Sequence, residues 1–213
     1  MIYKESLENI TNAAEEEFSE NGYHGTSLRE VTKKARINLA AVSYHFGSKE
    51  SLYCEVLKRR LRPMNQGRLN KLENASELAG DKPIPLALII DIFARPFFDL
   101  CDDPQENGGH FLRLIGRSIV DPLPFVENLL NEELHSTTSR FAQAIRRHTP
   151  SLNPQEFMWR LSFVVGAMHH TLATLHQMKT LTRGLCQNGD SAGAFRHFTH
   201  FAVNALTAPA RET

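Results

Sequence analysis

The sequence LAAVSYHFGSK, residues 39–49, has few of the Lys, Glu and Gln residues that usually fill the exposed side of a short helix. The helical face opposite Val42 and Phe46 consists of Leu39, Ala40, Ser43, Tyr44 and His45. Small apolar side chains can touch thymine methyl groups in a major groove, and hydroxyl, imidazole and ammonium groups can bind the flanking phosphates. This face therefore indicates contact with DNA, and a plain corner between two helices is the alternative.

The residues before this stretch predict the elements that would position it. Ser27 and Glu30 have the spacing of a capping box, in which each side chain binds the other residue's backbone N–H. Apolar residues then recur at spacings of three and four up to Ala35, which predicts a short helix. Arg36-Ile37-Asn38 interrupts the pattern, and Asn38 can cap a second helix over residues 39–46. The whole reads as a helix-turn-helix.

At these positions the sequence resembles the TetR family of bacterial transcription regulators. The resemblance covers about the first 60 residues and rests on Ser27, Val31, Ala35-Arg36-Ile37, Tyr44-His45-Phe46, Ser48-Lys49-Glu50 and Leu52. It implies these DNA-binding residues: Ser27, Arg29, Asn38, Leu39, Ala40, Ser43, Tyr44, His45 and Lys49. Two positions depart from the family pattern. Arg36 replaces the usual turn glycine and is expected in a left-handed conformation, and Ser43 stands where the family often has Tyr.

The distribution of charge agrees with a local nucleic-acid surface, although the chain of 213 residues has a formal net charge of zero. Residues 1–22 hold one Lys and six Glu, whereas residues 23–62 hold nine Lys and Arg against three Glu. The positive charge is thus confined to the helix-turn-helix and the helix after it. For Lys58, Arg59, Arg60 and Arg62 a solvated basic face is the favoured interpretation.

The rest of the chain predicts an all-α protein: an N-terminal three-helix DNA-binding domain joined to a larger helical ligand-binding and dimerisation domain. An opening helix over 4–21 ends at Gly22, and a fourth helix runs from Ser48 to about Asn74. Beyond a polar loop, helices are expected over 86–102, 108–120, 125–148, 154–181 and 191–207. The expected domains are 1–47 and 48–213.

The last two helices carry apolar residues on more than one side, which indicates burial on more than one side. One side can belong to the domain core and another to a second subunit, as the resemblance implies; a buried monomer core is the alternative. The expected interface residues are Phe163, Gly166, Ala167, His170, Phe198 and Phe201. A homodimer would place two recognition helices on successive major-groove faces of a palindromic operator.

The middle of the chain holds many bulky apolar residues, which either form a simple core or line a cavity for an effector. The expected ligand-binding residues are Phe93, Phe97, Phe111, Ile115, Phe125 and Phe141. The phrases NLAAVSYHFGSKE, HFLRLIGRSIVDP and FMWRLSFVVGAM resemble a TetR subgroup that responds to fatty acids or their coenzyme A esters. That resemblance implies a small apolar effector, with an acyl compound as the named candidate.

Enzyme and metal chemistry are the competing hypotheses. Ten histidines include His169-His170 and the pair His197 and His200, but the sequence has neither an HExxH motif nor the Gly-rich or Gly-x-Ser-x-Gly motifs of common catalytic sites. We therefore expect no cofactor, no metal and no enzymatic activity. The alternatives are a histidine-rich metal-binding protein or enzyme, and an architectural DNA-binding protein without an effector.

The sequence shows neither a signal peptide nor an apolar run of membrane-spanning length. Its three cysteines are isolated, as in a reducing compartment. The expectation is a cytoplasmic repressor without a membrane partner, which a ligand releases from its operator.

Overall fold

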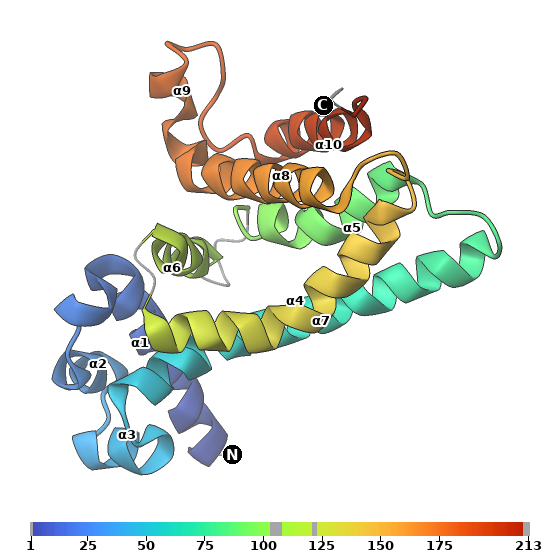
Figure 1. Ribbon diagram of the computed structural model, residues 1–213. Coiled ribbons are helices and arrows are strands. Elements are labelled where there is room, and N and C mark those ends of the chain that lie inside the picture. Colours follow the sequence, from blue (N-terminus) through green and yellow to red (C-terminus); the bar gives the residue numbers. More distant parts are fainter. Residues whose placement is uncertain (1, 103–107, 121–122, 211–213) are drawn as a thin grey trace. The chain divides into compact units, whose positions relative to one another are not determined.

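In the computed structural model the protein is all-α, and the structure describes residues 2–102, 108–120 and 123–210. No strand occurs within these ranges. Figure 1 labels the elements, which are α1 (Ile2–Gly25), α2 (Leu28–Ala35), α3 (Leu39–Phe46), α4 (Lys49–Ala79), α5 (Leu86–Asp99), α6 (Gly108–Val120), α7 (Pro124–Arg146), α8 (Pro154–Thr174), the 3-10 turn η1 (Leu175–Gln177), α9 (Met178–Leu181) and α10 (Ser191–Thr207). The predicted all-α class is confirmed.

The chain divides into two compact units. The first comprises the described residues of Met1–Pro63 and Gln105–Glu133, and the second comprises those of Met64–Pro104 and Leu134–Thr213. The helix-turn-helix and α6 thus belong to the first unit, while α5, α8 and α10 belong to the second. The division at residue 47 into a DNA-binding and an effector-binding domain stays a prediction about function.

Most helices were predicted within a few residues of their ends. The opening helix is interrupted at Gly22, where it was predicted to end: Gly22 has φ 71° and ψ 177°, which a residue without Cβ adopts readily, and helical residues then continue to Gly25. The predicted helix over 154–181 is wrong beyond Thr174, because the chain changes there to the 3-10 turn and the short α9. At this boundary the Thr174 hydroxyl donates to the His170 carbonyl at 2.8 Å.

The core of the first unit is built where the helices meet. Ile10, Ala14 and Phe18 of α1 are fully buried. Val31 of α2 and Val42 of α3 are buried in turn, so each short helix contributes one apolar face. Helices of eight residues have little stability of their own, and this packing holds them in place.

Glu15 is a charged residue of α1 that lies in the interior of the first unit. Its side chain is 1% exposed and pairs with Arg59 and Arg60 of α4. A local amphipathic pattern cannot show this, because the partners are more than forty residues away along the chain. The carboxylate is stabilised in the interior by two cations and by their hydrogen bonds.

The second unit packs α5 against α10 and α10 against α8. Phe98 of α5 contacts Phe195 and Phe198 of α10, with ring centroids 5.2 and 5.6 Å apart. Figure 1 shows α8 and α10 side by side near the C-terminal end of the chain. Val164 and Met168 place one face of α8 in this core, so its opposite face is available for other contacts.

Candidate functional site

The helix-turn-helix is fixed by local hydrogen bonds at both helix starts. Ser27 accepts from the Glu30 backbone N–H at 3.3 Å, and Glu30 accepts from the Ser27 backbone N–H at 2.9 Å. At the start of α3, Asn38 accepts from the Ala41 N–H at 2.8 Å. Both predicted caps are confirmed. Their side chains are engaged with the helix ends, so Ser27 and Asn38 fix the frame that presents the other residues predicted to bind DNA.

The turn between the helices is made by a non-glycine residue in a left-handed conformation. Arg36 has φ 56° and ψ 41°, as its place in the motif predicted. The following N–H, of Ile37, donates to the Thr32 carbonyl at 3.0 Å and closes the end of α2. The turn therefore has the required geometry, at a conformational cost of about 1 kcal/mol for the Cβ.

The free face of α3 is exposed as predicted. Tyr44 is 82% exposed and Leu39 is 41% exposed. Ala40 and Ser43 are exposed, and His45 is half-buried beside Tyr44, with ring centroids 5.1 Å apart. A bulky phenol and a leucine in solvent gain nothing for folding, which makes this face suitable for a macromolecular partner.

Lys49 lies in a less open position than the sequence predicted. Its ammonium is 4.4 Å from the centroid of the Tyr23 ring, and partial burial lowers its pKa. A cation over an aromatic face is attracted by the ring quadrupole. The interaction orients the ammonium, and its role as a phosphate ligand stays a prediction.

The other basic residues divide into paired and open ones. Arg62 pairs with Glu133 at 2.6 Å, and Lys34 pairs with Glu16 at 2.6 Å. Within the described residues Lys33, in the last turn of α2, is exposed and has no ion-pair partner. Neither Lys33 nor the exposed Arg36 was predicted to bind DNA. A sequence signal existed for Lys33. Neighbouring residues of a helix point in different directions, so Lys33 faces away from the acidic residues of α1 that pair with Lys34.

Helix α6 is anchored to α1 by polar contacts inside the first unit. Ser19 lies 2.6 Å from Nδ1 of His110, and Arg117 donates to the Glu20 carbonyl at 3.0 Å. Tyr23 contacts Phe125 with a centroid distance of 5.0 Å. These contacts join the start of α7 and the whole of α6 to the helix that supports the helix-turn-helix.

The six predicted effector residues lie in two units. Phe93, Phe97 and Phe141 belong to the second unit, where the rings of Phe93 and Phe141 are 5.2 Å apart. The first unit contains Phe111, Ile115 and Phe125. Phe97, Phe111, Ile115 and Phe141 are buried. Phe93 and Phe125 are half-buried, and the Phe125 ring is tilted against that of Tyr23. Their joint role in binding a ligand stays a prediction.

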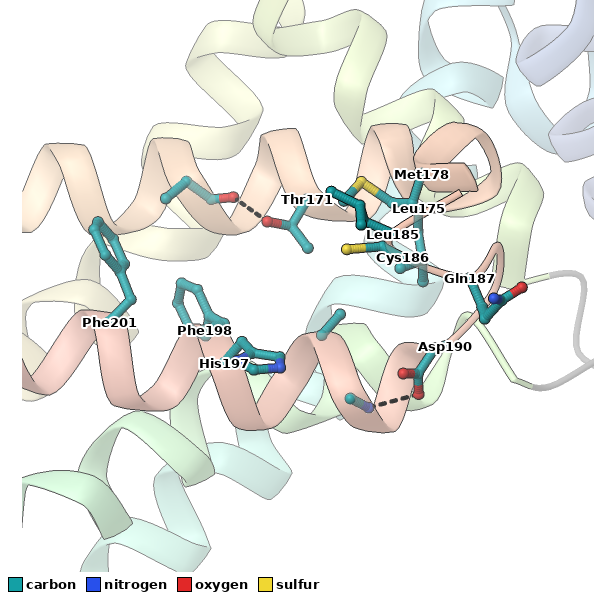
Figure 2. A pocket seen from close by; sticks show the side chains of 13 residues that line it. Thr171, Leu175, Met178, Leu185, Cys186, Gln187, Asp190, His197, Phe198 and Phe201 are labelled. Atoms are coloured by element: carbon teal, nitrogen blue, oxygen red, sulfur yellow. Dashed lines mark hydrogen bonds between the residues drawn. The ribbon is translucent and has the colours of Figure 1, made fainter. Parts of the chain in front are cut away.

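A pocket of about 540 Å³ lies elsewhere in the second unit, between α8, α10 and the segment that connects them (Figure 2). Its lining is mostly apolar and includes Thr171, Leu175, Met178, Leu185, His197 and Phe198. Figure 2 shows Phe198 and Phe201 on one side and Leu175 and Met178 toward the other. No predicted effector residue lines it. Ala167, Phe198 and Phe201, which were predicted for the dimer interface, do.

The predicted dimer face is largely exposed on this subunit. Phe163 is 62% and Phe201 is 48% exposed, and Gly166 and His170 are also exposed. Ala167 is half-buried, whereas Phe198 is 5% exposed because it packs on Phe98 in the core. Met158 and Trp159, which were not predicted for this face, are 58% and 57% exposed. Trp159 stacks on Phe163, with centroids 5.7 Å apart, and its spacing of four residues from Phe163 was the available signal.

The histidines of α8 and α10 are dispersed. Burial lowers the pKa of His169, while His170, His197 and His200 are exposed. Among the described residues no group of three or more His, Cys, Asp and Glu side chains is arranged to hold a metal ion. None of the helices in the described ranges has the length and apolar run needed to span a bilayer.

Comparison with family models decides the assignment. The model described as "Bacterial regulatory proteins, tetR family" matches residues 10–56, which contain the helix-turn-helix. The model described as "Tetracyclin repressor-like, C-terminal domain" matches residues 91–205, more than half of the chain. The protein belongs to the TetR family. Members of this family are transcription regulators and not enzymes.

Curated relatives of this TetR-family protein are similar over part of its length. The icaADBC negative regulator IcaR of Staphylococcus aureus (strain Newman) is 31% identical over 102 residues, which are 44% of this chain and 52% of that protein. The regulator RutR of Escherichia coli (strain K12) is 40% identical over 52 residues, or 24% of each chain. The matches to IcaR thus span about half the length of that relative.

Solved structures share the fold over nearly the whole chain. FadR of Bacillus subtilis, in complex with stearoyl-CoA, has a TM-score of 0.64 at 16% identity and covers 92% of this chain and 97% of that one. A HlyIIR mutant with a replaced internal segment has a TM-score of 0.61 at 20% identity, with 92% and 97% covered. At these sequence identities the structural similarity establishes only the fold of this TetR-family protein.

Proposed function

We propose that this TetR-family protein is a dimeric transcriptional repressor that binds a palindromic operator through α3 and leaves it when a small apolar effector binds. The observation that carries the proposal is the exposed, largely uncharged face of α3 on a frame held by the Ser27 and Asn38 caps. Repression is supported by the similarity, over part of the chain, to IcaR, which is a negative transcriptional regulator.

The DNA-binding step follows from the chemistry of that face. Leu39 and Ala40 are the first residues of α3. The N-terminal end of a recognition helix contacts base edges, so these two side chains can select thymine methyl groups. Tyr44 and Lys49 can hold phosphates on either side, and Lys33 and Arg36 add positive charge at the same surface. Arg29 and Ser43 are exposed on the two helices and complete the set.

Dimerisation is supported by the apolar face of α8 and α10. Trp159, Phe163 and Phe201 expose large apolar surfaces that a second copy could cover. Gly166 lies on the same face of α8, and a Cβ at this position would meet no atom of its own subunit within 4 Å. Two recognition helices joined in this way bind successive major-groove faces about 34 Å apart.

The effector class rests on the sequence resemblance to the fatty-acid-responsive subgroup and on the buried aromatic groups in the middle of the chain. Phe93 and Phe141 provide, within the second unit, the kind of apolar surroundings that an acyl chain requires; Phe111 and Ile115 are buried separately, within the first unit. FadR, which has the same fold, was crystallised with stearoyl-CoA. The ligand drives release only if it binds the DNA-free state more tightly than the DNA-bound one.

The test is enrichment of genomic fragments on the purified protein, followed by footprinting of the enriched sites. We expect a short palindrome whose affinity falls with added acyl compounds. A protein that enriches no sequence would contradict the proposal. One that binds a palindrome and ignores every apolar compound would support the architectural alternative.

A further inference from the structure

Arg68, in the middle of α4, is a buried cation without a counter-ion. Its side chain is 2% exposed, and it is the one buried Lys or Arg among the described residues. No carboxylate in the described part of the chain lies within ion-pair distance of it. Removing a charge from water is costly unless the interior supplies a partner. The described part of the subunit therefore gives this positive charge no counter-ion.

The guanidinium is held in a defined orientation. Nη1 donates to the Phe93 carbonyl at 3.1 Å, and Nη2 donates to the Asn65 side chain. The Phe93 carbonyl lies on α5 close to Pro96, which has no N–H and cannot bond the Ile92 carbonyl as a helix residue would. Nε points into the interior without an acceptor in the described residues. Nη1 and Nη2 are thus fixed by the protein, whereas the Nε edge of the guanidinium has no acceptor in the described residues.

The surroundings of this open edge belong to the predicted effector region. The guanidinium carbon is 5.0 Å from the centroid of the Phe93 ring and 5.2 Å from that of Phe97. Phe141 packs on Phe93 in turn. Two of the residues predicted to bind the effector therefore contact the buried cation and a third packs on one of them, all within the second unit.

We propose that Arg68 is the anion receptor of the effector site, and that the effector is an apolar molecule ending in a carboxylate that binds the guanidinium at Nε. The inference rests on the proposed function, because it names the chemical class of that effector. A carboxylate is planar and singly charged, and so matches an arginine fork between flat rings. A phosphate carries more charge and more acceptors, and no second buried cation in the described ranges accompanies Arg68.

The ionisation state of Arg68 is compatible with this role. Burial lowers its pKa to about 10, so the guanidinium is charged at neutral pH. The cations that the sequence would offer for a ligand head group are engaged elsewhere. These are Arg95, Arg113 and Arg117. Arg95 pairs with Asp91 and lies over the Phe195 ring, Arg113 lies 3.1 Å from Nδ1 of His110, and Arg117 binds the Glu20 carbonyl.

The test compares palmitate with methyl palmitate, which have the same chain and differ in charge. By calorimetric titration the full-length protein should bind palmitate at least about tenfold more tightly, a difference of 1.4 kcal/mol. Arg68→Met should remove this preference, and Lys71→Met, which removes an exposed cation three residues further along α4, should leave it intact. Ligand-free Arg68→Met should melt no lower than the wild type, because it removes an unbalanced buried charge.

If the Met variant does not fold, Arg68→Gln replaces it in the same test, since an amide can still donate a hydrogen bond but carries no charge. Equal affinity of the wild type for acid and ester would overturn the inference, as would failure to bind either. A preference for palmitate that survives Arg68→Gln would overturn it too. Operator binding is measured separately: loss of operator binding with an intact acid preference refutes the proposed function and leaves the assignment of Arg68 supported.

Discussion

At the scale of single residues, the exposed side chains of α3 and its flanks should divide into those that select sequence and those that hold DNA. Tyr44→Phe removes one hydroxyl from an 82% exposed side chain, so we expect weaker binding to every operator variant without a change in melting temperature. Lys49→Ala should reduce the slope of log affinity against log salt by about 1. Leu39→Ala should instead change which bases are preferred. Binding measured over a salt series on an operator library separates the three, and an unchanged salt slope for Lys49→Ala would contradict the proposed docking.

Arg36 offers a second test at this scale, because its φ of 56° is unfavourable for any residue with a Cβ. Arg36→Gly should stabilise the protein by up to about 1 kcal/mol, or roughly 2–4 °C in melting temperature for a chain of this size. Arg36→Ala is the matched control, since it removes the same charge and keeps the Cβ. If both variants melted alike, conformational strain would not be the cause. Loss of operator affinity in both would identify Arg36 as a DNA contact.

At the scale of elements, the features that could be predicted from the sequence are those that depend on residues close together along the chain. The Ser27 and Asn38 caps, the left-handed Arg36 and the free face of α3 follow from residues three or four positions apart. Glu15 and Arg68 were missed because their environments depend on distant segments. A signal for Arg68 existed: it lies seven residues after Leu61 and four before Leu72, both buried, and so shares their apolar face. Its orientation by the Phe93 carbonyl could not be foreseen.

The face of α8 and α10 gives the prediction at this scale. Phe163→Asp and Gly166→Trp should convert the dimer to monomers with unchanged helical content, because Phe163 is 62% exposed and a Cβ on Gly166 meets no atom of its own subunit. Operator affinity should fall by about a hundredfold or more through loss of avidity. Leu78→Asp, at a 90% exposed leucine on α4, is the control. Sedimentation decides the matter: a variant that stays dimeric at micromolar concentration would place the interface elsewhere.

At the scale of the whole molecule, operator and effector must compete through the protein, and the competition is reciprocal. If the effector prefers the DNA-free state a hundredfold, the coupling free energy is about 2.7 kcal/mol, and saturating operator must weaken effector binding by the same factor. Within the first unit, α6 is bound to α1 through His110 and Arg117, so a displacement of α6 would be transmitted to the helix that supports α2 and α3. Large-to-larger substitutions at Phe111 or Ile115 on α6 should therefore block the response.

We expect Ile115→Trp, at a side chain that is 8% exposed, to bind operator with wild-type affinity and to lose release by palmitate. Overpacking should cost about 1–3 kcal/mol, so its melting temperature must be measured alongside. In the wild type, palmitate at a hundred times its dissociation constant should add about 2.7 kcal/mol of stability. The decisive measurement is palmitate affinity with and without saturating operator. Equal affinities in the wild type would mean that the ligand and the DNA bind independently, and the regulatory part of the proposal would then be lost even if both complexes form.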